Sequence, residues 1–178
     1  MSSLDYILER IREAVSSIDA SSVEKLIEMI LEAKTIFLYG SGRSGLVGQF
    51  FAVRLVQLGL DVHFVGDMTT PIIGKNDLTI IISRTGETMS GVQTANIARR
   101  VGSSVVSVTS YKSSKLAHAS NMVIEIPFRN DPEASEHAPL GTLFEDSVNI
   151  FLDSVIPTLM KRLNMNEQAM RKRHAIWV

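Results

Sequence analysis

Two hydrophobic patterns alternate along this chain. Short apolar runs rich in β-branched residues are typical of strands buried on both faces of a sheet. Between them, apolar positions recur every three or four residues, as on one side of a helix. This pattern predicts five strands, over residues 35–39, 62–65, 78–82, 104–109 and 122–126.

Helices are expected between and around these strands. The first covers 3–17, the second begins at Ser21 or Ser22 and runs to about 33, and the segment 127–140, which contains three prolines, is expected to be a loop. Alternating strands and helices predict an α/β fold, a three-layer αβα sandwich around a five-stranded parallel sheet. A length of 178 residues suits one domain, 1–178. The other helices are expected over 46–58, 87–100, 113–118, 142–163 and 166–172.

The third strand ends in a run of hydroxyl side chains. Ser83, Thr85 and Thr88, together with Gly86, stand where a parallel strand would end and a helix would begin. Free backbone N–H groups at a helix N-terminus attract anions, and hydroxyls add hydrogen-bond donors without adding charge. We therefore interpret residues 83–88 as a phosphate-binding loop.

The first strand ends in Gly-Ser-Gly-Arg-Ser-Gly at 40–45, which satisfies the G-x-G-x-x-G pattern of dinucleotide sites. Asp61 or Asp67 would then bind the ribose. A second interpretation is a tight turn without a ligand. The interpretation we favour is a sugar-phosphate pocket shared with the 83–88 loop. If the first and third strands are neighbours, both loops face one crevice at the switch point of strand order.

Composition narrows the possible partners. The chain is 45% hydrophobic and 21% charged, with a formal net charge of −1, so no overall field favours nucleic acid or an anionic membrane. It contains no cysteine, which excludes disulfides and thiolate metal sites and suits a reducing compartment. The sequence shows neither a signal peptide nor an apolar membrane span, so a cytoplasmic protein is expected.

Several motifs resemble the sugar isomerase (SIS) domain family. The two loops carry the resemblance, together with 64–71 (Phe-Val-Gly-Asp-Met-Thr-Thr-Pro) and 139–145 (Pro-Leu-Gly-Thr-Leu-Phe-Glu). The likeness extends to Lys-Arg-His at 172–174 and so covers almost the full length. Within the family the chain looks most like the 6-phospho-3-hexuloisomerases.

This resemblance implies a five-stranded parallel sheet in flavodoxin-like order and a homotetramer or dimer with sites near subunit interfaces. It implies interconversion of D-arabino-hex-3-ulose 6-phosphate and fructose 6-phosphate in the ribulose monophosphate pathway. The pathway partner would be 3-hexulose-6-phosphate synthase. By the same likeness Ser44 would bind the phosphate, and Ser41 and Gly42 the sugar. Arg84 stands at a loop position where members of the family often have a small or polar residue.

Moving a carbonyl from C3 to C2 requires a base and stabilisation of an enediolate, but neither a metal nor another cofactor. Glu145 is the candidate base, because it opens a long helix and matches the acidic position of the family; an ordinary first-turn acid is the alternative. Arg43 is the candidate to stabilise the enediolate or the phosphate, unless it is merely a surface arginine. His174 is a candidate proton carrier for its own or a neighbouring subunit, unless it belongs to a solvated basic helix end.

Two other functions fit the same residues. A sugar-phosphate sensor without catalytic activity would use the same loops, although such regulators usually add a DNA-binding region. A related isomerase acting on an aldose phosphate or on sedoheptulose 7-phosphate would share the fold and the chemistry. Product analysis distinguishes all three.

Overall fold

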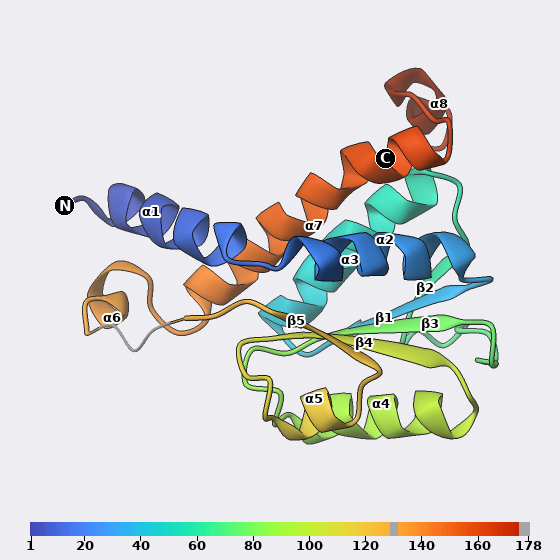
Figure 1. Cartoon of the computed structure of the whole chain (residues 1–178), viewed down its shortest axis with the longest axis horizontal. Helices are drawn as coiled ribbons and strands as arrows, with labels where there is room; N and C mark the ends of the chain where they lie inside the picture. The colour runs from blue at the N-terminus through green and yellow to red at the C-terminus, as the bar shows by residue number, and fades with distance from the viewer. Residues whose placement is uncertain (129–131, 175–178) are drawn as a thin grey trace.

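The computed structural model describes residues 1–128 and 132–174. One five-stranded, all-parallel sheet has helices on both faces (Figure 1), which confirms the α/β sandwich. The strand order is β2-β1-β3-β4-β5, the flavodoxin-like order. The strands are β1 (Ile36–Gly40), β2 (Val62–Phe64), β3 (Leu78–Ile82), β4 (Ser104–Thr109) and β5 (Met122–Glu125).

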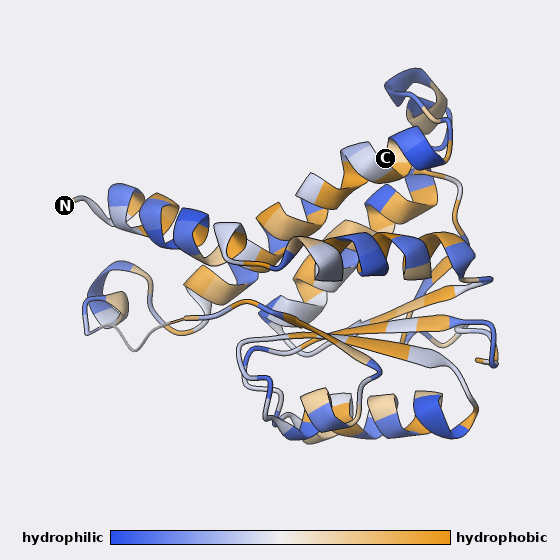
Figure 2. Ribbon diagram, in the orientation of Figure 1, coloured by the Kyte–Doolittle hydropathy of each residue, from blue (hydrophilic) through white to orange (hydrophobic). Residues whose placement is uncertain are grey.

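The central strand, β3, is buried on both faces, as its sequence predicts. Ile80 and Ile82 belong to the core cluster that includes helices α3 (Arg43–Gln57) and α7 (Thr142–Arg162). Ile81 points the other way, into a smaller cluster with α4 (Met89–Arg100). Successive side chains of a strand alternate between the faces of a sheet, so one apolar run serves both layers. Figure 2 shows that the strands are hydrophobic along most of their length.

The two helical layers are unequal. One face is covered by α2 (Ala20–Glu32), α3 and α7, and the other by α4 with α5 (Lys115–His118), as Figure 1 shows. The first helix, α1 (Ser3–Ser16), extends away from the sheet and packs against α7 and α6 (Ala134–His137). The short α8 (Glu167–Arg171) follows the far end of α7.

Helix α7 is the longest element, with 21 residues that extend about 30 Å at 1.5 Å per residue. It contains Pro157 and continues to Arg162. The N-terminal end of α7 lies beside the sheet, whereas its C-terminal end leads to α8 (Figure 1). Within the two described ranges no helix, α7 included, has the length and apolar character needed to cross a membrane.

The sequence prediction was wrong about α6, which lies inside the segment expected to be a loop. Its single turn packs against α1: the His137 ring lies 5.1 Å from the ring of Tyr6. Ala138 and Leu143 are buried in the same small cluster as Tyr6. Four residues are too few for a periodic pattern, so this turn depends on tertiary packing.

Two helices begin earlier than predicted. The cap of α2 is Asp19 and not Ser21 or Ser22, because the Asp19 carboxylate accepts the backbone N–H of Ser22. Helix α3 begins at Arg43 rather than 46, so half of the Gly-Ser-Gly-Arg-Ser-Gly segment is helical. A Cβ on Gly45 would lie 2.5 Å from the Gly40 carbonyl oxygen, so glycine allows the close approach of α3 to β1.

Candidate functional site

The two polar loops lie side by side, as the sequence predicts for neighbouring strands. Strands β1 and β3 pair directly, with Gly40 opposite Ile82 at their carboxyl ends. The chain reverses its direction across the sheet between these strands, so their ends mark the switch point where α/β sheets bind ligands. The Ser41 hydroxyl lies 3.4 Å from that of Ser90 and bridges the two segments.

A cavity of about 170 Å³ opens between the loops. This volume is about ten times the space that one water molecule needs. Most of its lining side chains carry hydroxyls, which can donate hydrogen bonds to an anion or a sugar. The lining residues are Tyr39, Ser41, Ser44, Ile82, Ser83, Arg84, Thr85, Thr88 and Gly91.

The 83–88 loop bends back on its own hydroxyls. Gly86 has a φ of +64°, a conformation that favours glycine, and its N–H donates to the Ser83 hydroxyl at 3.2 Å. The Glu87 N–H donates to the Thr85 hydroxyl at 3.3 Å, and the Ser83 hydroxyl donates to that of Thr88 at 3.4 Å. Thr88 is also the N-cap of α4, so the first N–H groups of this helix lie beside the loop. This arrangement suits a phosphate group.

Contacts from α5 hold the same loop in place. The Glu87 carboxylate accepts the backbone N–H of Lys115 at 3.0 Å and pairs with its ammonium group at 2.9 Å. The hydrogen bond from the Lys115 side chain is the largest of the effects that lower the pKa of Glu87. A Cβ on Gly86 would lie 2.1 Å from the Ser114 hydroxyl, so α5 also fixes the space around this glycine. No local sequence pattern indicates this role of Glu87.

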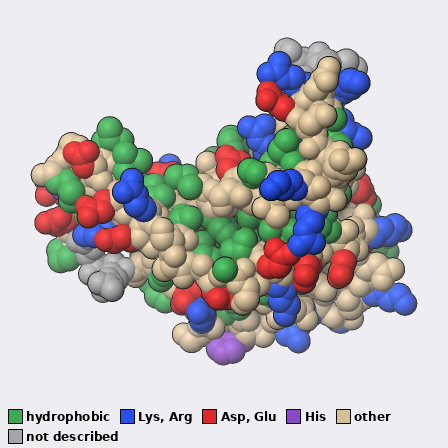
Figure 3. All heavy atoms as spheres, turned by 45° about the horizontal axis from the view of Figure 1, so that its top comes forward, with side chains coloured by type: hydrophobic (Ala, Val, Ile, Leu, Met, Phe, Trp, Pro, Cys, Tyr) green, Lys and Arg blue, Asp and Glu red, His purple; other side chains and the backbone are tan. Residues whose placement is uncertain are grey.

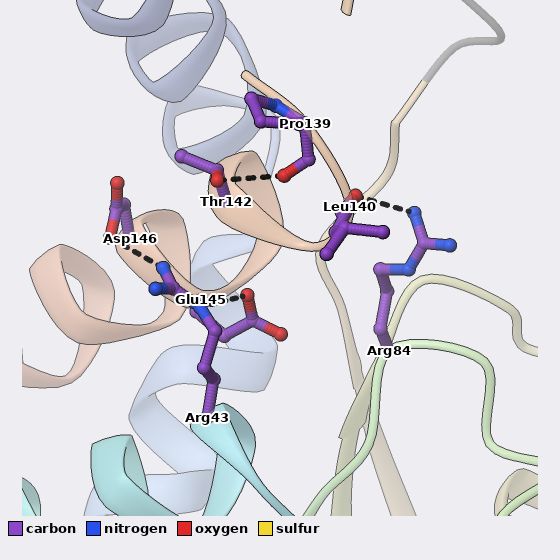
Figure 4. Close-up of polar contacts among 7 residues, drawn as sticks. All are labelled: Arg43, Arg84, Pro139, Leu140, Thr142, Glu145 and Asp146. Carbon is purple, nitrogen blue, oxygen red and sulfur yellow. Dashed lines mark hydrogen bonds and ion pairs between the residues drawn. The ribbon is translucent and has the colours of Figure 1, made fainter. Parts of the chain in front are cut away.

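Glu145 lies in the first turn of α7 with a buried side chain, and it is 7% exposed. The Arg43 Nε donates to its carboxylate at 3.1 Å, and another Arg43 nitrogen lies 3.9 Å from Asp146 (Figure 4). A buried carboxylate requires such a partner, because desolvation would otherwise destabilise its charged form. A Cβ on Gly141 would lie 2.5 Å from one Glu145 oxygen, so the carboxylate occupies the space above this glycine.

The cavity and the ion pair are adjacent parts of one site. Ser44 lines the cavity, and its neighbour Arg43 contacts Glu145. Neither Arg43 nor Glu145 lines the cavity itself. The hydroxyl-lined space is large enough for one end of a ligand, and the Glu145 carboxylate lies where the part that extends past the first loop would reach.

The structure brings most of the sequence-predicted residues together. Gly42 shapes the turn before α3 with a φ of +58°. Tyr39 and Gly91 also line the cavity and were not predicted from the sequence. The position of Tyr39, directly before the first glycine loop, was the available signal. The predicted residues that line the cavity are Ser41, Ser44, Ser83, Thr85 and Thr88.

His174 lies elsewhere. It is exposed and follows α8. A Cβ on Gly59 would lie 3.2 Å from the guanidinium of the neighbouring Arg173, and Gly59 follows the C-terminal end of α3, whereas Arg43 begins this helix. The 15 residues of α3 separate the two places by about 20 Å. Within one chain, His174 is therefore not part of the site that contains Glu145.

Known proteins are similar to this chain in both sequence and fold. The SIS domain model matches residues 29–139. A 3-hexulose-6-phosphate isomerase of Methanocaldococcus jannaschii is 39% identical over 86% of this chain and 83% of its own length. A 3-hexulose-6-phosphate isomerase of Bacillus subtilis is 32% identical over 98% of this chain and 98% of its own length. A solved structure from Methanococcus jannaschii, described as inferring that same function, is 34% identical, with a TM-score of 0.88 and 98% of each chain covered. Motifs, strand order and relatives thus agree, and the chain belongs to the SIS domain family.

Proposed function

We propose that this chain interconverts D-arabino-hex-3-ulose 6-phosphate and fructose 6-phosphate through an enediol intermediate. Four relatives named 3-hexulose-6-phosphate isomerase, 30–39% identical over most of the chain, support a phosphosugar isomerase. The observation that carries the proposal is the buried Glu145, held by Arg43 next to a hydroxyl-lined cavity.

In this proposal the 83–88 loop binds the phosphate and the 40–45 loop the adjoining sugar. Thr85 and Thr88 donate hydroxyl hydrogen bonds, Ser83 turns its single proton from Thr88 to the phosphate, and Ser44 completes the set from the opposite loop. Gly86 holds the loop in its bent form. Ser41 and Gly42 lie at the turn that the rest of the sugar passes. The phosphate is thereby fixed at one end, and C2 and C3 extend toward α7.

Glu145 then removes the proton from C2. The electron pair of that C–H bond forms the C2–C3 double bond, and negative charge develops on the oxygen of C3. Arg43 lies beside the carboxylate and can stabilise this charge, because its guanidinium is exposed on the open side. The proton of the C2 hydroxyl passes to the oxygen of C3, and return of a proton to C3 then yields the C2 carbonyl and the C3 hydroxyl of fructose 6-phosphate. His174 is proposed as a proton carrier for the site of a second copy of the chain, given its distance from its own Glu145.

A coupled assay tests this function. The chain is mixed with formaldehyde, ribulose 5-phosphate and 3-hexulose-6-phosphate synthase, the proposed pathway partner, and fructose 6-phosphate is measured. Formation of product that depends on the chain is expected. Glu145→Gln should abolish turnover yet retain binding of the phosphosugar by calorimetry, whereas Glu136→Gln, an exposed acid on α6, should retain activity. Absence of product with the unmodified chain would favour the sensor or a related isomerase.

We also propose that the chain forms a homotetramer or dimer through the outer side of α3. Leu46, Phe50 and Val53 follow one another at helical spacing and are 65%, 50% and 55% exposed. Such an apolar stripe is more than the isolated exposed residues of an ordinary surface. Figure 3 shows hydrophobic side chains gathered in the middle of the helical face, between α1 and α8. The reaction is proposed to occur in the cytoplasm, as part of the ribulose monophosphate pathway.

A further inference from the structure

Arg84 is placed to link the phosphate loop to the segment that carries the base. Its backbone is fixed, because its carbonyl accepts the Ser110 N–H at 3.0 Å and the Thr109 hydroxyl at 3.1 Å. Its side chain is exposed and lines the mouth of the cavity. The guanidinium can therefore turn about a fixed point at the edge of the proposed phosphate site.

From this position Arg84 reaches across to the turn before α7. One guanidinium nitrogen lies 3.5 Å from the carbonyl oxygen of Leu140, at the long limit for a hydrogen bond. Leu140 has a φ of +59°, and its side chain projects into solvent with 93% exposed. Figure 4 shows Leu140 between Arg84 on one side and the Arg43–Glu145 pair on the other.

The 139–141 turn sets the position of the Glu145 carboxylate. Gly141 follows Leu140, caps α7 and accepts the Glu145 N–H at 3.0 Å. Its Cα also lies under the Glu145 carboxylate, where even an added Cβ would not fit. A displacement of the Leu140 carbonyl therefore moves the residue on which the carboxylate rests.

A guanidinium has five N–H donors, so it can bind two acceptors at once. With a phosphate it can form paired hydrogen bonds in which both partners are charged, whereas the Leu140 carbonyl is a single neutral acceptor. A phosphate in the cavity would take the free donors of Arg84 and hold the side chain in one orientation. The long contact to Leu140 would then shorten and become persistent.

We propose that Arg84 couples phosphate binding to the placement of Glu145. It binds the substrate's phosphate and the Leu140 carbonyl together, and so fixes the 139–141 turn only when the phosphate site is filled. The ligand class, a phosphate monoester, rests on the proposed function. The coupling would explain how binding of the substrate's phosphate places the proposed base for the reaction.

The test uses inorganic phosphate as the probe, so it does not require turnover. Amide hydrogen exchange of Leu140, Gly141 and Thr142 is followed by NMR, with and without phosphate. In the unmodified chain phosphate should slow this exchange. Arg84→Gln should bind phosphate about tenfold more weakly or worse, and should show no slowing even at saturating phosphate. Arg84→Lys keeps the charge without the planar fork, so it should retain part of the affinity and lose the protection.

Arg99→Gln is the matched control, because the Arg99 guanidinium also donates to a backbone carbonyl, that of His118, at 3.3 Å. This contact joins α4 to α5, on the face of the sheet away from α7. It should leave both phosphate affinity and protection unchanged. Wild-type affinity in Arg84→Gln, or full protection in it at saturation, would overturn the coupling. If the unmodified chain shows protection but makes no fructose 6-phosphate, the proposed function is wrong and the coupling stands. Activity without any protection overturns the coupling alone.

Discussion

Replacing Gly141 with alanine would test the position of the Glu145 carboxylate without removing it. The Gly141 backbone has φ −101° and ψ 8°, which other residues can adopt, so the substitution adds no backbone strain of its own. The added Cβ would lie 2.5 and 2.6 Å from the two carboxylate oxygens and 2.9 Å from the carbon between them. Such contacts are too short to persist, so the Glu145 side chain must move.

The size of the effect follows from that movement. Relief of the contacts requires a shift of the order of 1 Å, and a misplacement of this size costs about 100-fold in rate. A factor of 100 corresponds to about 2.7 kcal/mol in the activation barrier. Overpacking at a well-packed position costs about 1–3 kcal/mol of folding stability. We therefore expect Gly141→Ala to fold, to bind phosphate normally and to have a kcat about 100-fold lower.

The measurement is steady-state isomerisation at saturating substrate, together with phosphate binding by calorimetry and thermal unfolding. Gly74→Ala is the control, since a Cβ there would meet the Asp77 carboxylate at an ordinary 3.7 Å. A kcat within twofold of the unmodified chain, in a folded Gly141→Ala protein, would show that the position of this carboxylate does not limit catalysis. Such a result would refute the assignment of Glu145 as the base.

Three further predictions follow from the site and the surface. Ser83→Ala combined with Thr85→Ala should weaken phosphate binding by about tenfold or more, measured by calorimetry; unchanged affinity would contradict the phosphate loop. Because Lys115 lowers the pKa of Glu87, their pairing stabilises the fold above pH 4.5, and this contribution is lost as the pH falls from 4.5 through the lowered pKa. Glu87→Gln should flatten that part of the dependence of Tm on pH, and an unaltered profile would count against the pair. Phe50→Asp should convert the proposed oligomer to a monomer by light scattering, and an oligomer of unchanged mass would exclude the α3 surface.

The sequence alone predicted the central strands well because β3 and β4 are buried on both faces. Leu78–Ile82 begins and ends where the apolar run does, since each of its residues is buried. The proximity of the two loops depended on strand order, which periodicity does not encode. The family resemblance supplied that order, and the pairing of β1 with β3 confirms it.

The sequence could not predict contacts between segments far apart in the chain. Arg43 and Glu145 are 102 positions apart, and no local pattern records their pairing. Arg84 and Leu140 are separated by 56 positions, so the sequence marked Arg84 as unusual without indicating what it contacts. The α6 turn was missed for the same reason, because its packing partner is α1.

The arrangement of charge in the site has a consequence for substrate choice. Apart from Arg84, the 83–88 loop offers neutral donors on a backbone fixed by β4 and α5, and Arg43 and Arg84 are exposed side chains on opposite loops. The proposed base, Glu145, is instead buried on α7, outside the cavity. A substrate must therefore span from the hydroxyl loop to α7 before its reacting carbons meet the carboxylate. In the proposed function, sugars whose reacting carbons lie at another distance from the phosphate would fill the same loop without placing a C–H bond at Glu145, so we expect the site to select by length as well as by charge.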